Sequence, residues 1–348
     1  MIIKNLVIRA DASVQIGTGH VMRCFALAQV WQEQGGQAIF VFANKSAALE
    51  DRLLLEGMQV IYLSVEAGSS EDAKQTGDFA RKFNTQWIVV DGYQFGTEYQ
   101  KNIKNFGLNL LFIDDYGHAD HYYADLVLNQ NISANIDLYP SREIYTKLLL
   151  GTQYILLRRE FWQWRGWQRE TKAIANNLLI TLGGSDPDNV TLKVLQALRL
   201  IRSNNLEIII VIGGSNPHFE ILQNKIADSN LIISLKQNVQ NMPELMAWAD
   251  IAIAAGGSTS WELAFMGLPS LVISLADNQI AIAEKLNIHQ IIDYLGWHEH
   301  IQIKQVSQAV QDFIGDCAKR EQMSLKGRKL VNGNGLQLVI AEMSNMLN

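Results

Sequence analysis

Three apolar runs in the second half of the chain each end in Gly-Gly-Ser, and this repeated ending limits the fold more than any other feature. The runs cover residues 178–182, 207–212 and 251–255. Each is typical of a buried parallel strand that passes into a helix, because glycine allows a tight turn and leaves backbone N–H groups accessible. The intervals between the runs differ, so they do not form a solenoid repeat.

The same alternation of apolar runs and helical stretches covers the rest of the chain. It predicts an α/β fold with parallel sheets. The 348 residues are enough for two domains, and the stretch 148–169 interrupts the pattern as their connection. We therefore expect domains at 1–155 and 156–330, followed by a closing helix within 331–348. The other expected strands are 5–8, 38–43, 60–64, 87–91, 110–114, 126–129, 231–235, 271–275 and 291–292.

Composition excludes several classes of function. The chain is 48% hydrophobic with a formal net charge of −6, which indicates a globular protein without the basic surface that nucleic acids or anionic membranes attract. No stretch approaches the roughly 20 apolar residues of a spanning helix, and the apolar start at 1–3 lacks a cleavage site. We expect a cytoplasmic protein with both cysteines reduced.

Residues 17–20, Gly-Thr-Gly-His, follow the first apolar run. Apolar residues recur at helical spacing from Val21 onward, which places His20 in the first turn of a helix. Gly17 and Gly19 can adopt positive φ and let a ligand approach the free N–H groups there. The helix dipole disfavours a protonated imidazole, so His20 is a candidate general base near neutral pH. The alternative is an ordinary tight turn between a strand and a helix.

Carboxylates follow three of the expected strands in the first half. The carboxyl ends of parallel strands share one edge of the sheet, so Asp11, Asp91 and the pair Asp114-Asp115 are expected there beside His20. Asp114 is our candidate for the residue that orients His20, and Asp11 and Asp91 are the alternatives.

Two patterns nearby are weak signals of metal or thiol chemistry. His118 and His121 lie three residues apart, but no three-ligand motif accompanies them, so we interpret 114–121 as a solvated loop without metal. Cys24 is four residues after His20 on nearly the same helix face, and a thiol nucleophile stays an alternative.

The last of the Gly-Gly-Ser loops is the best candidate for binding a phosphate. Gly256 and Gly257 permit a close approach, Ser258 can cap the following helix, and that helix, from about Thr259, offers N–H groups and its dipole. Its Glu262 either accepts hydrogen bonds from ribose hydroxyls or belongs to a capping box. Further along, Asn278 and Gln279 can donate to phosphate or sugar oxygens, or act as caps.

Taken together, these motifs closely resemble the UDP-2,4-diacetamido-2,4,6-trideoxy-β-L-altropyranose hydrolases of pseudaminic acid biosynthesis, relatives of MurG-type glycosyltransferases. The resemblance extends nearly end to end and implies the GT-B architecture, two Rossmann-like βαβ domains facing across a cleft. It is carried by residues 9–13, 17–24, 91–93, 114–115, 124–131, 156–161, 183–187, 254–262 and 276–279.

The resemblance also implies a reaction, in which water attacks the anomeric carbon with inversion and releases UDP and the free sugar. It implies His20 as the general base, Tyr93 as a residue that holds the sugar or the water, Asp11 as a further catalytic residue, and no metal or cofactor. A monomer without a nucleic-acid or membrane partner is expected. Substrate or UDP contacts are implied for Gly17, Gly19, Arg23, Arg158, Gly184, Ser185, Gly257, Ser258, Thr259, Glu262, Asn278 and Gln279.

Three alternatives remain open at this point. A glycosyltransferase of the same fold would use an acceptor hydroxyl in place of water. A hydrolase could act on a related UDP-amino sugar, because close sugar variants are not separable from the sequence. A nucleotide-sugar-binding protein would perform no chemistry. Release of UDP without an acceptor distinguishes a hydrolase from the transferase and from the binding protein.

Overall fold

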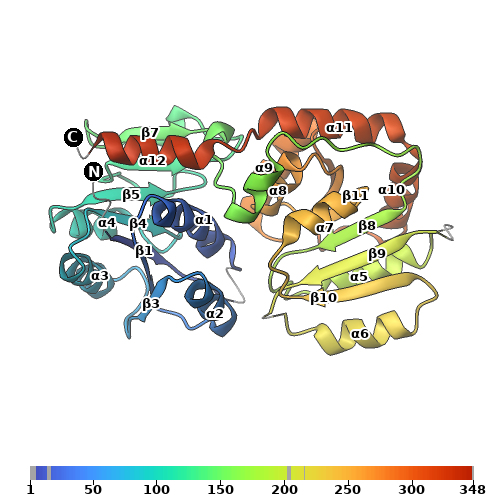
Figure 1. The fold of residues 1–348 in the computed structure, drawn as a ribbon, viewed down its shortest axis with the longest axis horizontal. Helices are drawn as coiled ribbons and strands as arrows, with labels where there is room; N and C mark the ends of the chain where they lie inside the picture. Colours follow the sequence, from blue (N-terminus) through green and yellow to red (C-terminus); the bar gives the residue numbers. More distant parts are fainter. Residues whose placement is uncertain (1–4, 14–16, 202–204, 215, 347–348) are drawn as a thin grey trace. The chain divides into compact units, whose positions relative to one another are not determined.

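The computed structural model describes residues 5–13, 17–201, 205–214 and 216–346 (Figure 1). The chain forms two compact units, Met1–Arg159 with Gly333–Asn348 and Glu160–Asn332. The apolar start at 1–3, residues 14–16 of the first loop and Ser215 lie outside the described residues. Among the described residues, no helix combines the length and apolar character needed to cross a bilayer.

The first unit is built on a parallel sheet with the strand order β3-β2-β1-β4-β5-β6-β7 among its described residues. Its inner strands β1, β2 and β4 are buried along their whole length and rich in Val, Ile and Phe, as strands covered on both faces are. The strands are β1 (Leu6–Ala10), β2 (Ala38–Phe42), β3 (Gln59–Tyr62), β4 (Trp87–Asp91), β5 (Asn109–Ile113), β6 (Leu126–Asn129) and β7 (Lys147–Leu150).

The helices of the first unit connect successive strands, and one returns from the far end of the chain. The boundaries follow local chemistry: in α3 the hydroxyl of Ser69 accepts a hydrogen bond from the N–H of Asp72, and basic residues occupy the last turn. The helices are α1 (Gly19–Glu33), α2 (Ala47–Leu55), α3 (Ser70–Lys82), α4 (Thr97–Lys104) and α12 (Gly335–Asn345), with short 3₁₀ turns at Ile136–Leu138 and Thr152–Tyr154; a third, Arg159–Trp164, begins the second unit.

The second unit repeats this plan with the parallel strand order β10-β9-β8-β11-β12-β13. Its strands are β8 (Asn177–Thr181), β9 (Glu207–Ile212), β10 (Ile232–Gln237), β11 (Ile251–Ala255), β12 (Ser270–Ser274) and β13 (Asp293–Trp297). Its helices are α5 (Val190–Leu198), α6 (Phe219–Ala227), α7 (Met242–Trp248), α8 (Thr259–Phe265), α9 (Asp277–Ile288), α10 (Ile303–Gly315) and α11 (Cys317–Leu330).

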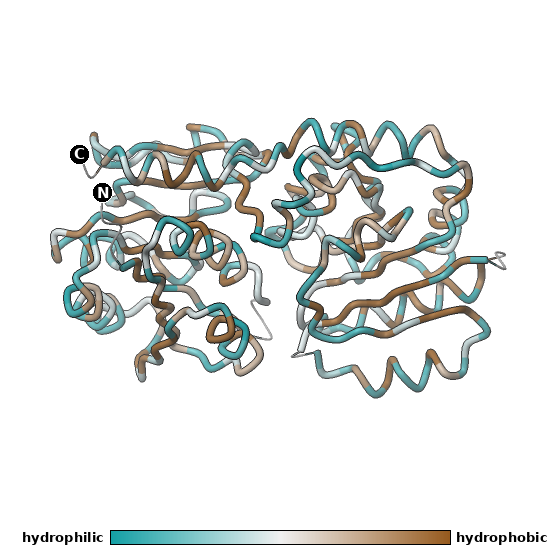
Figure 2. The backbone as a smooth tube through the Cα atoms, viewed as in Figure 1, coloured by the Kyte–Doolittle hydropathy of each residue, from teal (hydrophilic) through white to brown (hydrophobic). Residues whose placement is uncertain are grey.

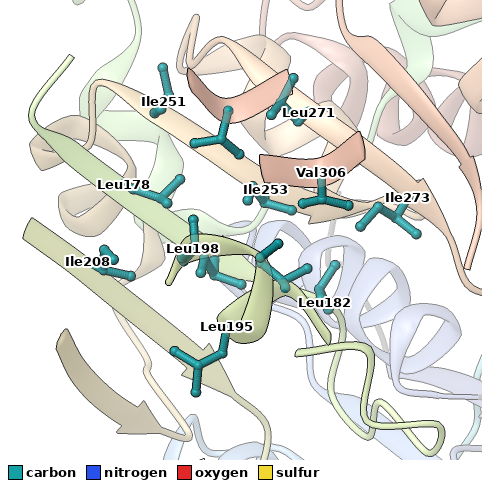
Figure 3. Packing of buried hydrophobic residues seen from close by; sticks show 14 of the residues in the cluster. Leu178, Leu182, Leu195, Leu198, Ile208, Ile251, Ile253, Leu271, Ile273 and Val306 are labelled. Atoms are coloured by element: carbon teal, nitrogen blue, oxygen red, sulfur yellow. The ribbon is translucent and has the colours of Figure 1, made fainter. Parts of the chain in front are cut away.

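The core of the second unit lies between its sheet and helices α5 and α10. Leu178 and Ile253 from adjacent strands, Leu198 from α5 and Val306 from α10 pack together and are fully buried (Figure 3). The hydropathy colouring shows the same pattern, with mostly hydrophobic residues along the strands and more hydrophilic residues in the connections (Figure 2). Burial of this apolar surface is the main stabilising contribution to the unit.

The predicted strands are confirmed with two exceptions, both at sheet edges. The stretch 148–169 was expected to be a connection, but β7 occupies Lys147–Leu150 and pairs with β6. The last strand was expected at 291–292, but β13 covers Asp293–Trp297 and pairs irregularly with β12. Both strands are only partly buried, and their patterns are weak, because β7 begins with an exposed lysine and β13 contains Asp293 and Gly296.

Candidate functional site

In each sheet the chain runs outward in both directions from one pair of adjacent strands. That pair is β1 and β4 in the first unit and β8 and β11 in the second. The loops after these strands separate, one to each side, and ligands of open α/β sheets bind at this point. Most of the predicted site residues follow these two pairs of strands, whereas Arg158 follows β7 and Asn278 and Gln279 follow β12.

His20 is the second residue of α1 and is buried, so its predicted place in the first turn of a helix is confirmed. The preceding loop is closed by a hydrogen bond from the N–H of Gly17 to the carbonyl of Ser13, and Gly17 has a φ of 71°. Gly19 does not adopt a positive φ, since it is the first residue of the helix.

The imidazole of His20 contacts Asp91 at the end of β4. Its Nδ1 lies 2.6 Å from Oδ1 of the carboxylate, and Arg23 donates to both oxygens of the same group. Burial raises the pKa of the Asp91 carboxyl, but Arg23 and His20 lower it by more than burial raises it. The net pKa is therefore below its ordinary value. An ionised carboxylate can only accept, so the shorter contact, to Asp91, assigns the proton to Nδ1 and leaves Nε2 as the basic nitrogen; one terminal nitrogen of Arg23 lies 3.2 Å from the same Nδ1.

The prediction that Asp114 orients His20 is therefore wrong, and Asp91 is the residue in that position. The carboxylate of Asp114 accepts the N–H groups of Tyr116 and Gly117 and the hydroxyl of Tyr122. Strand order is the reason, because β4 rather than β5 lies next to β1.

Asp11, predicted to be catalytic, lies at the end of β1 in a different set of contacts. Its carboxylate is 2.7 Å from Arg9, a fully buried arginine, and accepts the N–H groups of Ala43 and Asn44. These contacts hold the loop after β2 against β1. Among the described residues, Asp11 does not contact His20. Its catalytic role stays a prediction.

Arg23, predicted to bind substrate, lies between two carboxylates. Its Nε is 2.6 Å from Asp91, and one terminal nitrogen is 2.7 Å from Asp115 in the loop after β5. Burial lowers its pKa, but the two carboxylates raise it well above the ordinary value, so the guanidinium stays charged. The sequence did not predict that Asp115 pairs with Arg23. It predicted only that Asp115 lies at the same edge of the sheet as His20.

Tyr93 lies beside His20, with the two rings edge to face and their centres 4.8 Å apart. Its hydroxyl donates to Asp115 at 2.7 Å. Tyr116, whose side chain is about half exposed, packs at 5.2 Å from the ring of Tyr93. The predicted neighbourhood of His20 and Tyr93 is thus present, and an aromatic surface extends from it.

The thiol and metal alternatives receive no support from the contacts. Burial raises the pKa of the Cys24 thiol well above its ordinary value, which disfavours the nucleophilic thiolate. In the loop after β5, His118 faces Asp114, whereas His121 contacts Ser141 and Glu143. Among the described residues, no group of three His, Cys, Asp or Glu side chains is arranged to hold a metal ion.

In the second unit the glycine loops after β8 and β11 stand at the pair of strands where the chain order reverses. Gly184 is half-buried and Ser185 is buried, and the following Asp186 caps α5 by accepting the N–H groups of Val190 and Thr191. The loop after β9 packs closely behind them: a Cβ on Gly213 would lie 2.1 Å from the carbonyl oxygen of Gly184.

The loop after β11 carries Gly257, Ser258 and Thr259, all half-buried. Glycine fits closely before them, since a Cβ on Gly256 would approach Cβ of Gln279 in α9 to 3.2 Å. Helix α8 begins at Thr259, so Trp261 takes the third helical position that a capping box uses. Glu262 comes fourth and is half-buried, which weighs against the capping-box alternative.

The remaining predicted contacts fall in two places. Gln279 reaches back from α9, and its side-chain oxygen accepts the N–H of Leu275 at 2.9 Å, while its Nε2 is 3.6 Å from where a Cβ on Gly257 would stand. Asn278 is exposed on the same helix. Arg158 belongs to the first unit and is buried. Their contacts to substrate stay predictions.

Comparison with known sequences supports the resemblance. Residues 178–332 match the model of the glycosyltransferase family 28 C-terminal domain. The spore coat polysaccharide biosynthesis protein SpsG of Bacillus subtilis is 25% identical, with 97% of each chain covered. A protein of Campylobacter jejuni named UDP-2,4-diacetamido-2,4,6-trideoxy-β-L-altropyranose hydrolase is 26% identical over 80% of this chain and 94% of its own.

Solved structures with the same fold include MurG of Acinetobacter baumannii, with a TM-score of 0.66 and 17% identity over 98% of this chain and 99% of that one. The S. aureus MnaA structure with UDP has a TM-score of 0.68 at 12% identity, over 99% and 97% of the two chains. With two parallel-sheet α/β units, the predicted GT-B fold class is confirmed.

Proposed function

We propose that this protein is a UDP-sugar hydrolase that cleaves UDP-2,4-diacetamido-2,4,6-trideoxy-β-L-altropyranose to UDP and 2,4-diacetamido-2,4,6-trideoxy-L-altrose. The observation that carries the proposal is the contact between Nδ1 of His20 and the ionised Asp91, because it makes Nε2 a base. The similarity to the Campylobacter jejuni protein of that name indicates the substrate.

In the proposed reaction, water attacks C1 of the sugar on the face opposite the diphosphate. The new C1–O bond forms as the bond from C1 to the phosphate oxygen breaks, and the electron pair of that bond leaves on UDP. Nε2 of His20 takes the proton of the water, and Asp91 stabilises the resulting imidazolium. Tyr93, whose proton is directed to Asp115, positions the sugar or the water with its ring and oxygen.

The glycine loops of the second unit are proposed to bind UDP. Backbone N–H groups around Gly184, Ser185, Gly257 and Ser258 would neutralise the diphosphate, which makes UDP a good leaving group without a dedicated acid. Glu262 would accept the two ribose hydroxyls. The proposed reaction needs no metal, cofactor or macromolecular partner, and a cytoplasmic location is proposed with it.

A glycosyltransferase is the second candidate, because residues 178–332 match a glycosyltransferase domain. The test is to incubate the protein with a panel of UDP-diacetamido sugars in chelated buffer, without an acceptor, and to measure UDP. We expect stoichiometric UDP and free sugar, with the altropyranose substrate turned over fastest. UDP formation that requires an added acceptor would establish a transferase, and UDP binding without turnover of any sugar, with or without an acceptor, would contradict both enzymes.

A further inference from the structure

The ionic cluster behind His20 contains a second carboxylate that the proposed reaction has not yet used. Asp115 lies in the loop between β5 and β6, and its side chain is about 10% exposed. One oxygen accepts from Arg23 and from the amide of Asn131, at 2.7 and 2.8 Å. The other accepts from Arg23 at 3.1 Å and from the hydroxyl of Tyr93 at 2.7 Å. Each oxygen therefore has two donors.

These contacts link Asp115 to three groups around the His20 ring, Asp91 and Arg23 on one side and Tyr93 on the other. On one side, Arg23 continues from Asp115 to Asp91, which contacts Nδ1 of His20. On the other side, Tyr93 packs its ring edge to face with the imidazole. Removing one carboxylate would release a guanidinium and a phenol at the same time. We infer that Asp115 is a positioning residue for His20 that acts through Arg23 and Tyr93.

The charges of the cluster support the inference. Asp91 and Asp115 are both ionised. Burial raises the pKa of each carboxyl, but Arg23 and the surrounding donors lower it by a larger amount. With one guanidinium the cluster carries one uncompensated negative charge while His20 is neutral. When His20 takes a proton, the charges balance. The cluster is therefore arranged to stabilise the protonated state that the proposed reaction produces.

Other titratable groups around His20 do not change this balance near neutral pH. The Cys24 thiol and the Tyr116, Tyr122 and Tyr139 phenols are neutral, because burial raises the pKa of each. His118 has a raised pKa because, against the effect of burial, Asp114 favours its protonated form, and these two compensate one another. Asp11 shares Arg9 with Asp72 in a separate set of contacts that does not include His20. Within the cluster in contact with His20, Asp115 thus provides the charge that the imidazolium balances.

The inference rests on the proposed function, so its test has one measurement that needs no substrate. The titration of the His20 ring is followed by ¹⁵N NMR, and its signals are assigned with His20→Asn. In Asp115→Asn we expect the midpoint to fall by about 0.5–1 pH unit, since a negative charge that favours the imidazolium is removed. The acidic limb of the pH profile of kcat/KM should move to lower pH by the same amount.

Turnover gives the second measurement. We expect kcat of Asp115→Asn to fall about 10- to 100-fold with KM little changed, because His20 and Tyr93 lose their alignment. Asp115→Glu should restore the midpoint. Asp125→Asn is the matched control, because Asp125 is also a mostly buried carboxylate of the same unit and pairs with one cation, Lys104. Its loss should change neither the titration midpoint of His20 nor the acidic limb of the pH profile.

The outcomes separate the two proposals. An unchanged His20 midpoint in folded Asp115→Asn overturns the inference, whatever the activity. A shifted midpoint in a protein that hydrolyses no UDP-sugar leaves the link to His20 in place and contradicts the proposed function. If Asp115→Asn does not fold, Asn131→Ala decides, since it removes one donor to Asp115 and keeps Arg23, Tyr93 and His20: wild-type kcat in that variant overturns the inference, and a loss of about tenfold supports it.

Discussion

Oδ1 of Asp91 lies 2.6 Å from Nδ1 of His20, although the two residues are 71 positions apart in the chain. Because β4 pairs with β1 in parallel register up to Ala10 and Asp91, the carboxylate is fixed by the sheet rather than by a loop. This arrangement gives the imidazole one orientation and one basic nitrogen, which a general base requires.

His20→Asn should lower turnover by roughly 10²- to 10⁴-fold, the usual loss for a general base, while UDP affinity stays nearly unchanged. Kinetics and calorimetry with UDP check the two parts. In ¹⁸O-labelled water the wild-type enzyme should place the label in the released sugar, because attack at carbon breaks the C–O bond. Label in the phosphate of UDP would remove the role given to His20.

Glu262→Gln should weaken UDP binding by about 1.5–3 kcal/mol, since the hypothesised hydrogen bonds from ribose would lose their charged acceptor. Turnover of bound substrate should change much less. Calorimetry with UDP measures the effect, and Glu284→Gln, at an exposed glutamate of α9, is the control. Equal affinities in the two folded variants would contradict the ribose assignment.

Gly213→Ala should destabilise the second unit by about 1–3 kcal/mol, because the new methyl group would overlap the carbonyl of Gly184. The displaced loop should also weaken UDP binding. Gly315→Ala offers the comparison, since no atom lies within 4 Å of its added Cβ. Chemical denaturation of the two variants measures the difference, and equal stabilities would show that the loops adjust without cost.

Asp115→Asn should make the protein less sensitive to acid. The folded-state pKa of this carboxyl is held well below its ordinary value, because Arg23 outweighs the effect of burial. Its contribution to stability is therefore complete above the unfolded pKa of about 3.9 and is lost as the pH falls toward the folded value. Unfolding free energies at pH 6 and pH 3 should differ more in the wild type than in the variant. Asp120→Asn, at an exposed residue of the same loop, should behave as the wild type.

EDTA should leave UDP release unchanged. The histidines of the loop after β5 already contact Asp114, Ser141 and Glu143, and the proposed reaction relies on His20 alone as base. Turnover before and after dialysis against chelator measures this. Activity that disappears and returns with a divalent ion would contradict the metal-free proposal.

The inner strands and the start of α1 could be predicted because each carries a strong local pattern. The run 87–91 is apolar up to a terminal aspartate, and residues 17–20 contain glycine directly before the helix. The strand β7 could not, because it begins with an exposed lysine and contains only three apolar residues. Local patterns therefore indicate a strand best where the apolar run is longer, as in β4.

The partner of His20 could not be predicted for a different reason. Asp11, Asp91 and Asp114 all end strands at the same edge of the sheet, and the choice among them depends on which strand lies next to β1. Strand order is a property of the whole sheet and cannot be inferred from the residues of a single strand. The double role of Arg23 depends on the same order, since Asp91 and Asp115 follow neighbouring strands.

Helix α12 has a consequence for how the protein is made. It belongs to the first unit, where Lys147 of β7 contacts its Glu342, yet it is encoded after the entire second unit. On the ribosome, the apolar face of Leu336, Val339, Ile340 and Met343 is made only after Glu160–Asn332, so the first unit lacks this helix throughout that synthesis. The first unit can therefore complete its core only after the whole second unit has been synthesised.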